Sequence, residues 1–179
     1  GTGRMGGGYI RTYNNSGRET SYLGTGSDNS GQLRIYDKLG ETRSYIGDGY
    51  LQAYNQFGER TIFLGTGTNG GGYLRTYNFS GQESIYVGTG ADSSGQIRIY
   101  DNSGETGSFL GSGYFRTYNR FGKLTTFIGN ASDGGGYLRT NNKFETETVF
   151  LGTNNANEGL INLNDKFGQS FWIRLNKKN

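Results

Sequence analysis

The chain has no cysteine, no histidine and no proline among its 179 residues. Without cysteine no disulfide can form, and the redox compartment cannot be inferred from cysteine usage. The lack of histidine removes the usual general base and the commonest metal ligand. Because proline is missing and glycine does not recur at every third residue, a collagen triple helix is excluded. Acid–base and metal chemistry therefore lose their most frequent participants.

Long apolar runs and clusters of like charge are also missing. No run approaches the ~18 residues of a membrane-spanning helix, and no signal-peptide pattern stands at the N-terminus. The net charge is only +3, with Lys and Arg interspersed among Asp and Glu, unlike the basic stripe of a nucleic-acid-binding protein. We therefore expect neither nucleic-acid binding nor membrane insertion.

The chain does contain a repeat of 64 residues. Residues 1–14 return closely as residues 65–78, and in altered form as residues 129–142. The chain starts in phase with this repeat, in mid-linker, so we expect it to be a piece of a longer array. A catalytic centre needs one set of residues in one place, whereas a rod or a periodic binding surface copies its residues along the chain. The repeat therefore favours a rod or a periodic binding surface over an enzyme.

A shorter period lies inside the long one. A Tyr-Asn or Tyr-Asp step, replaced by Asn at the last two places, recurs at spacings of 23, 18 and 23 residues within each cycle. It falls at Tyr13, Tyr36, Tyr54, Tyr77, Tyr100, Tyr118, Asn141 and Asn164. We expect the 18-residue step to lack a five-residue excursion such as residues 26–30. Eight units of this kind fill the chain.

Each unit is predicted to fold as strand, tight turn and strand. In residues 73–78, Leu74 and Thr76 alternate with Tyr73 and Arg75, which places aliphatic and aromatic-basic residues on opposite faces. The turn at residues 78–81 opens with Asn and ends with a Gly that supplies the positive φ. Because glycine interrupts every window of helical spacing, we predict about sixteen short strands and essentially no helix.

The two faces suggest how the strands are covered. We expect the core to be an aliphatic row made of Ile10, Leu33, Leu51, Leu74, Ile97, Phe115, Leu138 and Ile161. Aliphatic residues are too few for a thick monomeric core, and a lone sheet would present open edges. The fold class is therefore predicted as all-β, an elongated repeat fibre forming an interwoven homotrimeric, triple-stranded β-helix. The alternative is a monomeric β-solenoid.

The C-terminal part departs from the repeat. Glu145 replaces the turn glycine, Asn141 and Asn164 replace tyrosine, and residues 171–174 replace the aromatic-aliphatic-Gly triplet. We expect residues 1–152 to form the repeat shaft and residues 153–179 to form a terminal capping unit, because an outermost repeat must finish the sheet without offering a template.

The basic and aromatic residues are the candidate contacts for a host cell-surface glycan or receptor. The candidates are Arg11, Arg34, Arg75, Arg98, Arg139, Trp172 and Arg174. The favoured interpretation is structural: guanidinium groups lie over neighbouring Tyr rings and pair with Glu of adjacent strands, such as Glu19, Glu41, Glu83 and Glu105. For Trp172 we likewise favour a capping aromatic.

Other candidate chemistries are weaker. The linkers at Asp28, Asp92 and Asp133 lack the dense acidic spacing of a calcium loop, so we interpret them as solvated turns. Glycine runs precede strands, whereas a phosphate cradle needs a helix N-terminus. The acidic residues stand beside turns or at strand positions expected to be exposed, unlike the general acid of a glycosidase. We predict no catalytic residue, no metal site and no cofactor.

Units of the form Gly-x-Leu-x-x-Tyr-Asn-x-x-Gly-x-x-x-x-Tyr-Leu-Gly resemble those of bacteriophage tail-fibre and prophage proteins, and of long surface proteins of Bacteroidetes-type bacteria. Residues 159–168 are similar to the Asn-Asp-Arg-Tyr-Gly closing unit of such arrays. The resemblance implies a trimeric β-structured shaft, on a virion or at a cell surface, involved in attachment. It transfers no catalytic residue. We therefore expect a non-enzymatic attachment protein; the alternative is a glycan-binding or glycan-degrading module.

Overall fold

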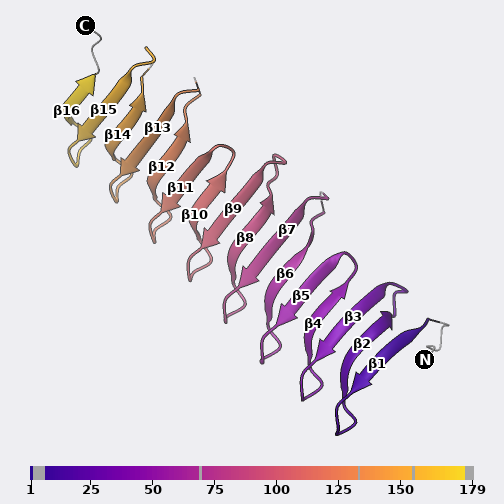
Figure 1. Cartoon of the computed structure of the whole chain (residues 1–179). Coiled ribbons are helices and arrows are strands. Elements are labelled where there is room, and N and C mark those ends of the chain that lie inside the picture. The colour runs from indigo at the N-terminus through magenta and orange to yellow at the C-terminus, as the bar shows by residue number, and fades with distance from the viewer. Residues whose placement is uncertain (2–6, 69, 133, 155, 176–179) are drawn as a thin grey trace. The chain divides into compact units, whose positions relative to one another are not determined.

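The structure is a computed structural model that describes residues 1, 7–68, 70–132, 134–154 and 156–175 (Figure 1). The described residues form sixteen strands and no helix, which confirms the all-β prediction. None of them belongs to a helix that could cross a membrane. The chain divides into two compact units, Gly1–Thr89 and Gly90–Asn179.

The first unit contains β1 (Tyr9–Tyr13), β2 (Glu19–Thr25), β3 (Gly31–Tyr36), β4 (Thr42–Gly47), β5 (Tyr50–Tyr54), β6 (Arg60–Thr66), β7 (Gly72–Tyr77) and β8 (Glu83–Thr89). The second contains β9 (Gly95–Tyr100), β10 (Thr106–Gly111), β11 (Tyr114–Tyr118), β12 (Leu124–Asn130), β13 (Gly136–Asn141), β14 (Glu147–Thr153), β15 (Gly159–Asn164) and β16 (Ser170–Leu175).

Within each unit, every strand pairs antiparallel with the next one along the chain. Leu74 of β7, for example, lies opposite Leu64 of β6 and Val87 of β8. Among the described residues of each unit, strands contact only their neighbours in this meander. Each unit is therefore a single layer of sheet, and its neighbouring strands lack the parallel stacking of coils expected for the solenoid alternative.

The turns after odd-numbered strands share one construction. In the β7–β8 turn the side-chain Oδ1 of Asn78 accepts hydrogen bonds from the backbone N–H groups of Ser80, at 2.9 Å, and Gln82, at 3.0 Å. Gly81 has a φ of 75°, as the sequence predicted. The same bonding recurs at Asn14, Asp37, Asn55, Asp101, Asn119, Asn142 and Asp165. We call these eight turns the Asx turns.

The turns after even-numbered strands lie at the opposite edge and come in two lengths. Asp48-Gly49 and Ser112-Gly113 are two-residue turns in which both residues have positive φ, the arrangement of a type I′ hairpin. The β2–β3 turn is longer, and its Gly26 N–H bonds the carbonyl oxygen of Ser30 at 2.7 Å. This difference in turn length confirms the predicted origin of the 18-residue step.

Packing within each layer is concentrated on the aromatic face. In the first unit Tyr45, Tyr50, Phe63, Tyr73 and Tyr86 form a continuous ladder with one ring per strand, and ring centroids 5.1 to 5.8 Å apart. In the second unit the ladder consists of Phe109, Tyr114, Phe127, Tyr137 and Phe150. Phe127, 5% exposed, is the one hydrophobic side chain that is buried among those described.

Glycine makes room for these rings. Tyr137 lies in register opposite Gly129 of β12 and Gly152 of β14. A Cβ on Gly152 would stand 2.5 Å from the Tyr137 Cβ and 2.8 Å from the Gly136 carbonyl oxygen. In every aromatic-aliphatic-Gly triplet but that of Gly47, where a Cβ would meet the Tyr45 ring of the same strand, the glycine is thus required by the close approach of the neighbouring strand.

The aliphatic row does not form a core within the chain, contrary to expectation. In the row itself, Ile10 is 64% exposed and Ile97 is 38% exposed. Residues that flank other members of the row on even-numbered strands, such as Leu64 and Leu151, are about half exposed. No second layer of either unit covers this face among the described residues. The physical reason is that a single sheet buries a face only through contacts inside the layer, and rings reach across strands better than aliphatic side chains do.

We predict that Gly152→Ala lowers the free energy of unfolding by about 1–3 kcal/mol, because its methyl group must displace the backbone beside Tyr137. Urea unfolding followed by circular dichroism measures this change. Gly159→Ala, on the strand paired with that of Gly152, is the control, since a Cβ there meets nothing within 4 Å. Equal effects of the two substitutions would contradict the assigned role of the glycine.

The β13–β14 Asx turn carries Glu145 at a φ of 67°, where seven sister turns have glycine. A left-handed non-glycine residue costs about 1–2 kcal/mol, and the exposed Glu145–Lys123 ion pair (2.8 Å) recovers less than that. We predict that Glu145→Gly raises the melting temperature. Gly122→Ala, at φ 72° in open space, should lower it. A fall with Glu145→Gly would contradict this account.

Candidate functional site

The predicted arginine row lies on the aromatic face. Arg34 on β3 and Arg75 on β7 belong to the first unit, and Arg98 on β9 and Arg139 on β13 to the second, where Arg116 on β11 stands between them. The row occupies odd-numbered strands, so adjacent members are about 10 Å apart, two strand spacings. In β5 of the first unit, Gln52 takes the position of arginine. Within each unit, the structure therefore places these arginines on one face of the sheet.

The guanidinium groups lie over the rings. The guanidinium carbon of Arg75 is 4.8 Å from the centroid of Tyr73 and 5.6 Å from that of Tyr86. That of Arg116 is 4.3 Å from Tyr114. The interpretation that these side chains cover aromatic rings is therefore confirmed at these positions, and such contacts stabilise by ~0.5–1 kcal/mol each when exposed.

Several arginines of the row also bind acidic or amide side chains. Arg11 on β1 lies 3.5 Å from Glu19, and Arg75 lies 3.3 Å from Glu83, which confirms the predicted pairing at these two positions. Among the described residues Glu41 and Glu105 form no such ion pair, so the prediction was wrong for them. Arg34 and Arg98 donate instead to glutamine. The Arg34 Nη2 bonds the Gln32 Oε1 at 3.1 Å, and the Arg98 Nη2 bonds that of Gln96 at 3.3 Å. Half-exposed cations therefore remain alongside stacked rings.

Sequence reasoning missed one member of this face. Arg60, on the second strand of its hairpin, has its guanidinium carbon 4.8 Å from the Tyr77 centroid and 5.5 Å from that of Phe63. It lies on β6, between β5, which carries Gln52, and β7, which carries Arg75, and it supplies a cation where the first-strand pattern lacks one. The signal was the register of the second strand, in which Arg60 pairs with Tyr54.

The phenol of Tyr45 stays protonated on this face. Burial, followed by the charge interaction with Tyr50, raises the pKa of Tyr45 to about 12. Its hydroxyl donates a hydrogen bond to the Asp48 Oδ2 at 3.2 Å. This tyrosine therefore acts as a neutral donor near neutral pH and offers no phenolate nucleophile.

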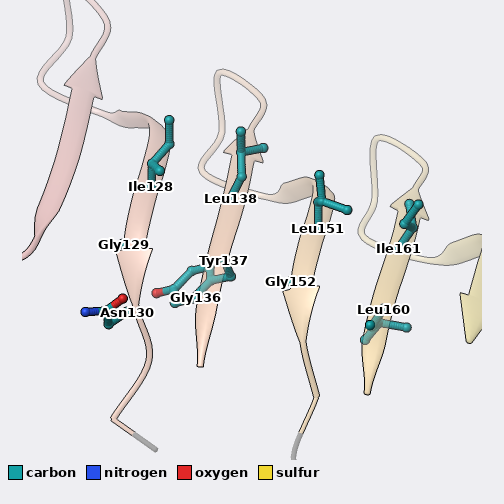
Figure 2. Close-up of a pocket in the computed structure, with 11 residues that line it drawn as sticks. Ile128, Gly129, Asn130, Gly136, Tyr137, Leu138, Leu151, Gly152, Leu160 and Ile161 are labelled. Atoms are coloured by element: carbon teal, nitrogen blue, oxygen red, sulfur yellow. The ribbon is translucent and has the colours of Figure 1, made fainter. Parts of the chain in front are cut away.

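The opposite face carries an open aliphatic groove in each unit. In the second unit Ile128, Leu138, Leu151 and Ile161 lie side by side across four neighbouring strands (Figure 2). They line a groove of about 770 Å³. In the first unit Ile10, Leu23, Leu33 and Ile46 line a comparable groove of about 700 Å³. Unlike the rings of the aromatic ladder, these side chains are covered by no other group of the described residues.

The Asx turns carry exposed apolar side chains that the sequence analysis did not single out. Phe79 is 86% exposed and Phe57 is 77% exposed. Phe121, Phe144 and Phe167 occupy the same turn position as Phe57 and are similarly exposed. The available signal was the recurrence of Phe or Leu one residue before the turn glycine or its replacement.

The acidic linkers form turns. Asp92 accepts hydrogen bonds from the Ser94 hydroxyl (2.7 Å) and N–H (3.1 Å) and from the Ser112 hydroxyl (3.0 Å). These bonds, first that of the Ser94 hydroxyl, lower the pKa of Asp92. Among the described residues no cluster of three or more metal-ligating side chains occurs. Asp133 lies outside the described residues.

Trp172 and Arg174 lie on the last strand. In backbone register Trp172 is opposite Leu163 and Arg174 is opposite Ile161. Their side chains lie outside the described part of the structure, and so their predicted contact with a glycan or receptor stays a prediction.

Comparison with known proteins yields no match to a family model and no match to a curated protein. Among solved structures, the chain is similar to one chain of the Photorhabdus luminescens Tc holotoxin pore, with 13% identity and a TM-score of 0.26. That alignment covers 88% of this chain and 12% of the other. So low a TM-score supports no argument about fold or function.

Proposed function

We propose that this chain is a segment of a self-associating β-fibre, the shaft or distal part of an attachment protein on a virion or at a cell surface, with a structural rather than catalytic role. The observation that carries this proposal is the aliphatic row, whose face of the sheet no second layer covers among the described residues. The aliphatic face of another copy of the chain can pack against this face and cover it.

The energetics favour association through this face. Leu64 and Leu110 are 50% and 49% exposed, and full burial of such a side chain contributes about 1.5–3 kcal/mol relative to exposure. The row continues from strand to strand, so its contributions add along the array. Exposed apolar patches of this extent on soluble proteins mark interaction sites.

A homotrimer is the form of this fibre that we favour. Each chain would supply a single-layer sheet, and the sheets of three chains would form the three sides of the fibre. In this arrangement the aliphatic faces point to the common axis and the aromatic-arginine faces point outward. Attachment is the function that a long shaft of this kind serves in the phage and bacterial surface proteins it resembles.

Molar mass measured by multi-angle light scattering tests the association. We expect three times the chain mass of 19.6 kDa. Leu110→Asp with Ile128→Asp should reduce the mass to that of a single chain, because charges would enter the apolar contact. Asn102→Asp, at an exposed Asx turn, should leave it unchanged. A wild-type mass of one chain would overturn the fibre proposal.

A second candidate function is the binding of anionic glycans by the aromatic face. The ladder of stacked rings with arginines about 10 Å apart favours it, because rings stack on sugars and guanidinium groups pair with carboxylate or phosphate.

Glycan-array binding distinguishes this candidate. The substitutions Arg34→Gln and Arg75→Gln should weaken binding at least tenfold while folding is retained, because Gln52 already occupies an equivalent position in the ladder. A charged hydrogen bond contributes about 1.5–3 kcal/mol, which sets this minimum. The Asn102→Asp chain is the control. Unchanged binding after both arginine substitutions would exclude the aromatic face as the glycan site.

A further inference from the structure

Three Asx turns of the second unit present one exposed ring and one cation each. Phe121, Phe144 and Phe167 are 67%, 72% and 73% exposed. The residue before each ring is basic, and its charged group lies over that ring. The contacts are Arg120 on Phe121 at 4.7 Å, and Lys143 on Phe144 and Lys166 on Phe167 at 4.9 Å. We call these six residues the tip row.

Contacts between turns fix the tip row in place. The Lys123 Nζ lies 2.8 Å from the Glu145 Oε2 and joins the first two turns. The Asn142 side-chain amide donates to the Lys166 carbonyl oxygen at 3.1 Å and joins the second and third. The three turns follow every second strand of one meander, so the rings are about 10 Å apart along one edge. The row is thus organised in advance of any ligand.

The polar groups of these turns are already used. The Asn119 Oδ1 accepts the N–H groups of Phe121 and Lys123 at 2.9 and 3.1 Å. The Asp165 carboxylate likewise accepts two backbone N–H groups at 2.9 Å. Recognition of a sugar or a peptide needs several well-placed polar groups, whereas this edge offers mainly apolar rings and cations.

The charge of the edge is positive. Four cations, Arg120, Lys123, Lys143 and Lys166, stand beside Glu145 and Asp165. Glu145 is paired with Lys123, and Asp165 caps its own turn. Four cations against two carboxylates give these turns a net charge of +2, and the cations that accompany the three rings form no ion pair among the described residues.

We propose that the tip row docks on the surface of an anionic lipid bilayer. The three rings enter the boundary between headgroups and acyl chains, and the three cations meet the lipid phosphates, the arrangement by which apolar and basic residues together bind membrane surfaces. No segment crosses the bilayer. The inference goes beyond the fibre proposal, because it assigns the surface that an edge contacts rather than the face that joins copies.

Co-sedimentation of the full chain with vesicles tests the docking. The probe is vesicles of phosphatidylglycerol and phosphatidylcholine in equal amounts, compared with phosphatidylcholine alone. We expect binding to the anionic vesicles and loss of binding at high salt. Lys143→Ser should lower the partition coefficient about fivefold, because one basic residue near an anionic surface contributes ~1 kcal/mol. Phe121→Ser, Phe144→Ser and Phe167→Ser together should lower it about a hundredfold.

The chain supplies matched controls. Ser103 occupies the same turn position as these rings, so serine is compatible with the turn. Phe57→Ser removes an equally exposed ring whose preceding residue, Gln56, is uncharged, and it should leave vesicle binding unchanged.

Three results would overturn the docking proposal: no wild-type binding to anionic vesicles, full binding by the triple serine chain, or a triple serine chain with reduced molar mass, which would make the tip row a contact between copies. Light scattering on the same samples separates this outcome from failure of the fibre proposal.

Discussion

Both units depend on the stacking of aromatic rings across neighbouring strands, in which the rings of odd-numbered strands lie opposite glycine. A single layer of sheet has no second layer to pack on, so its apolar burial must come from side chains of adjacent strands. Tyr73, opposite Gly65 and Gly88, can approach both neighbouring strands closely because those glycines have no side chain. Arginine guanidinium groups lie over these rings, and Phe127, the one buried hydrophobic side chain among those described, belongs to this ladder.

This constraint makes the two faces unequal. The aromatic face is largely satisfied within the chain, since Arg75 contacts two rings and a glutamate. The aliphatic face is not, since Leu64 and Leu151 remain about half exposed. Strict alternation along each strand separates the two sets completely. Association through the aliphatic face therefore leaves the aromatic face and the turn edges available for other contacts in a fibre.

The Asx turns form a third surface, and its residues are constrained differently from those of the two faces. Their backbone geometry is satisfied by Asn or Asp and by a left-handed residue, so the remaining turn positions are free to vary. That freedom explains why Phe121 and Ser103 can occupy equivalent places. Variation there alters the chemistry of an edge without altering the sheet. A repeat protein can in this way carry local specificity on a constant frame.

Local rules in the sequence determined the strands, the alternation of faces and the turns. Asn78 and Gly81 specify their turn through their own bonding and φ, whatever surrounds them. The tertiary structure alone decided which face is packed. A pattern shows that Leu74 and Val87 share a face, but not whether another layer covers it. The placement of Arg60 and the exposure of Phe144 likewise depend on register and neighbouring turns, which are relations between strands that alternation along one strand does not contain.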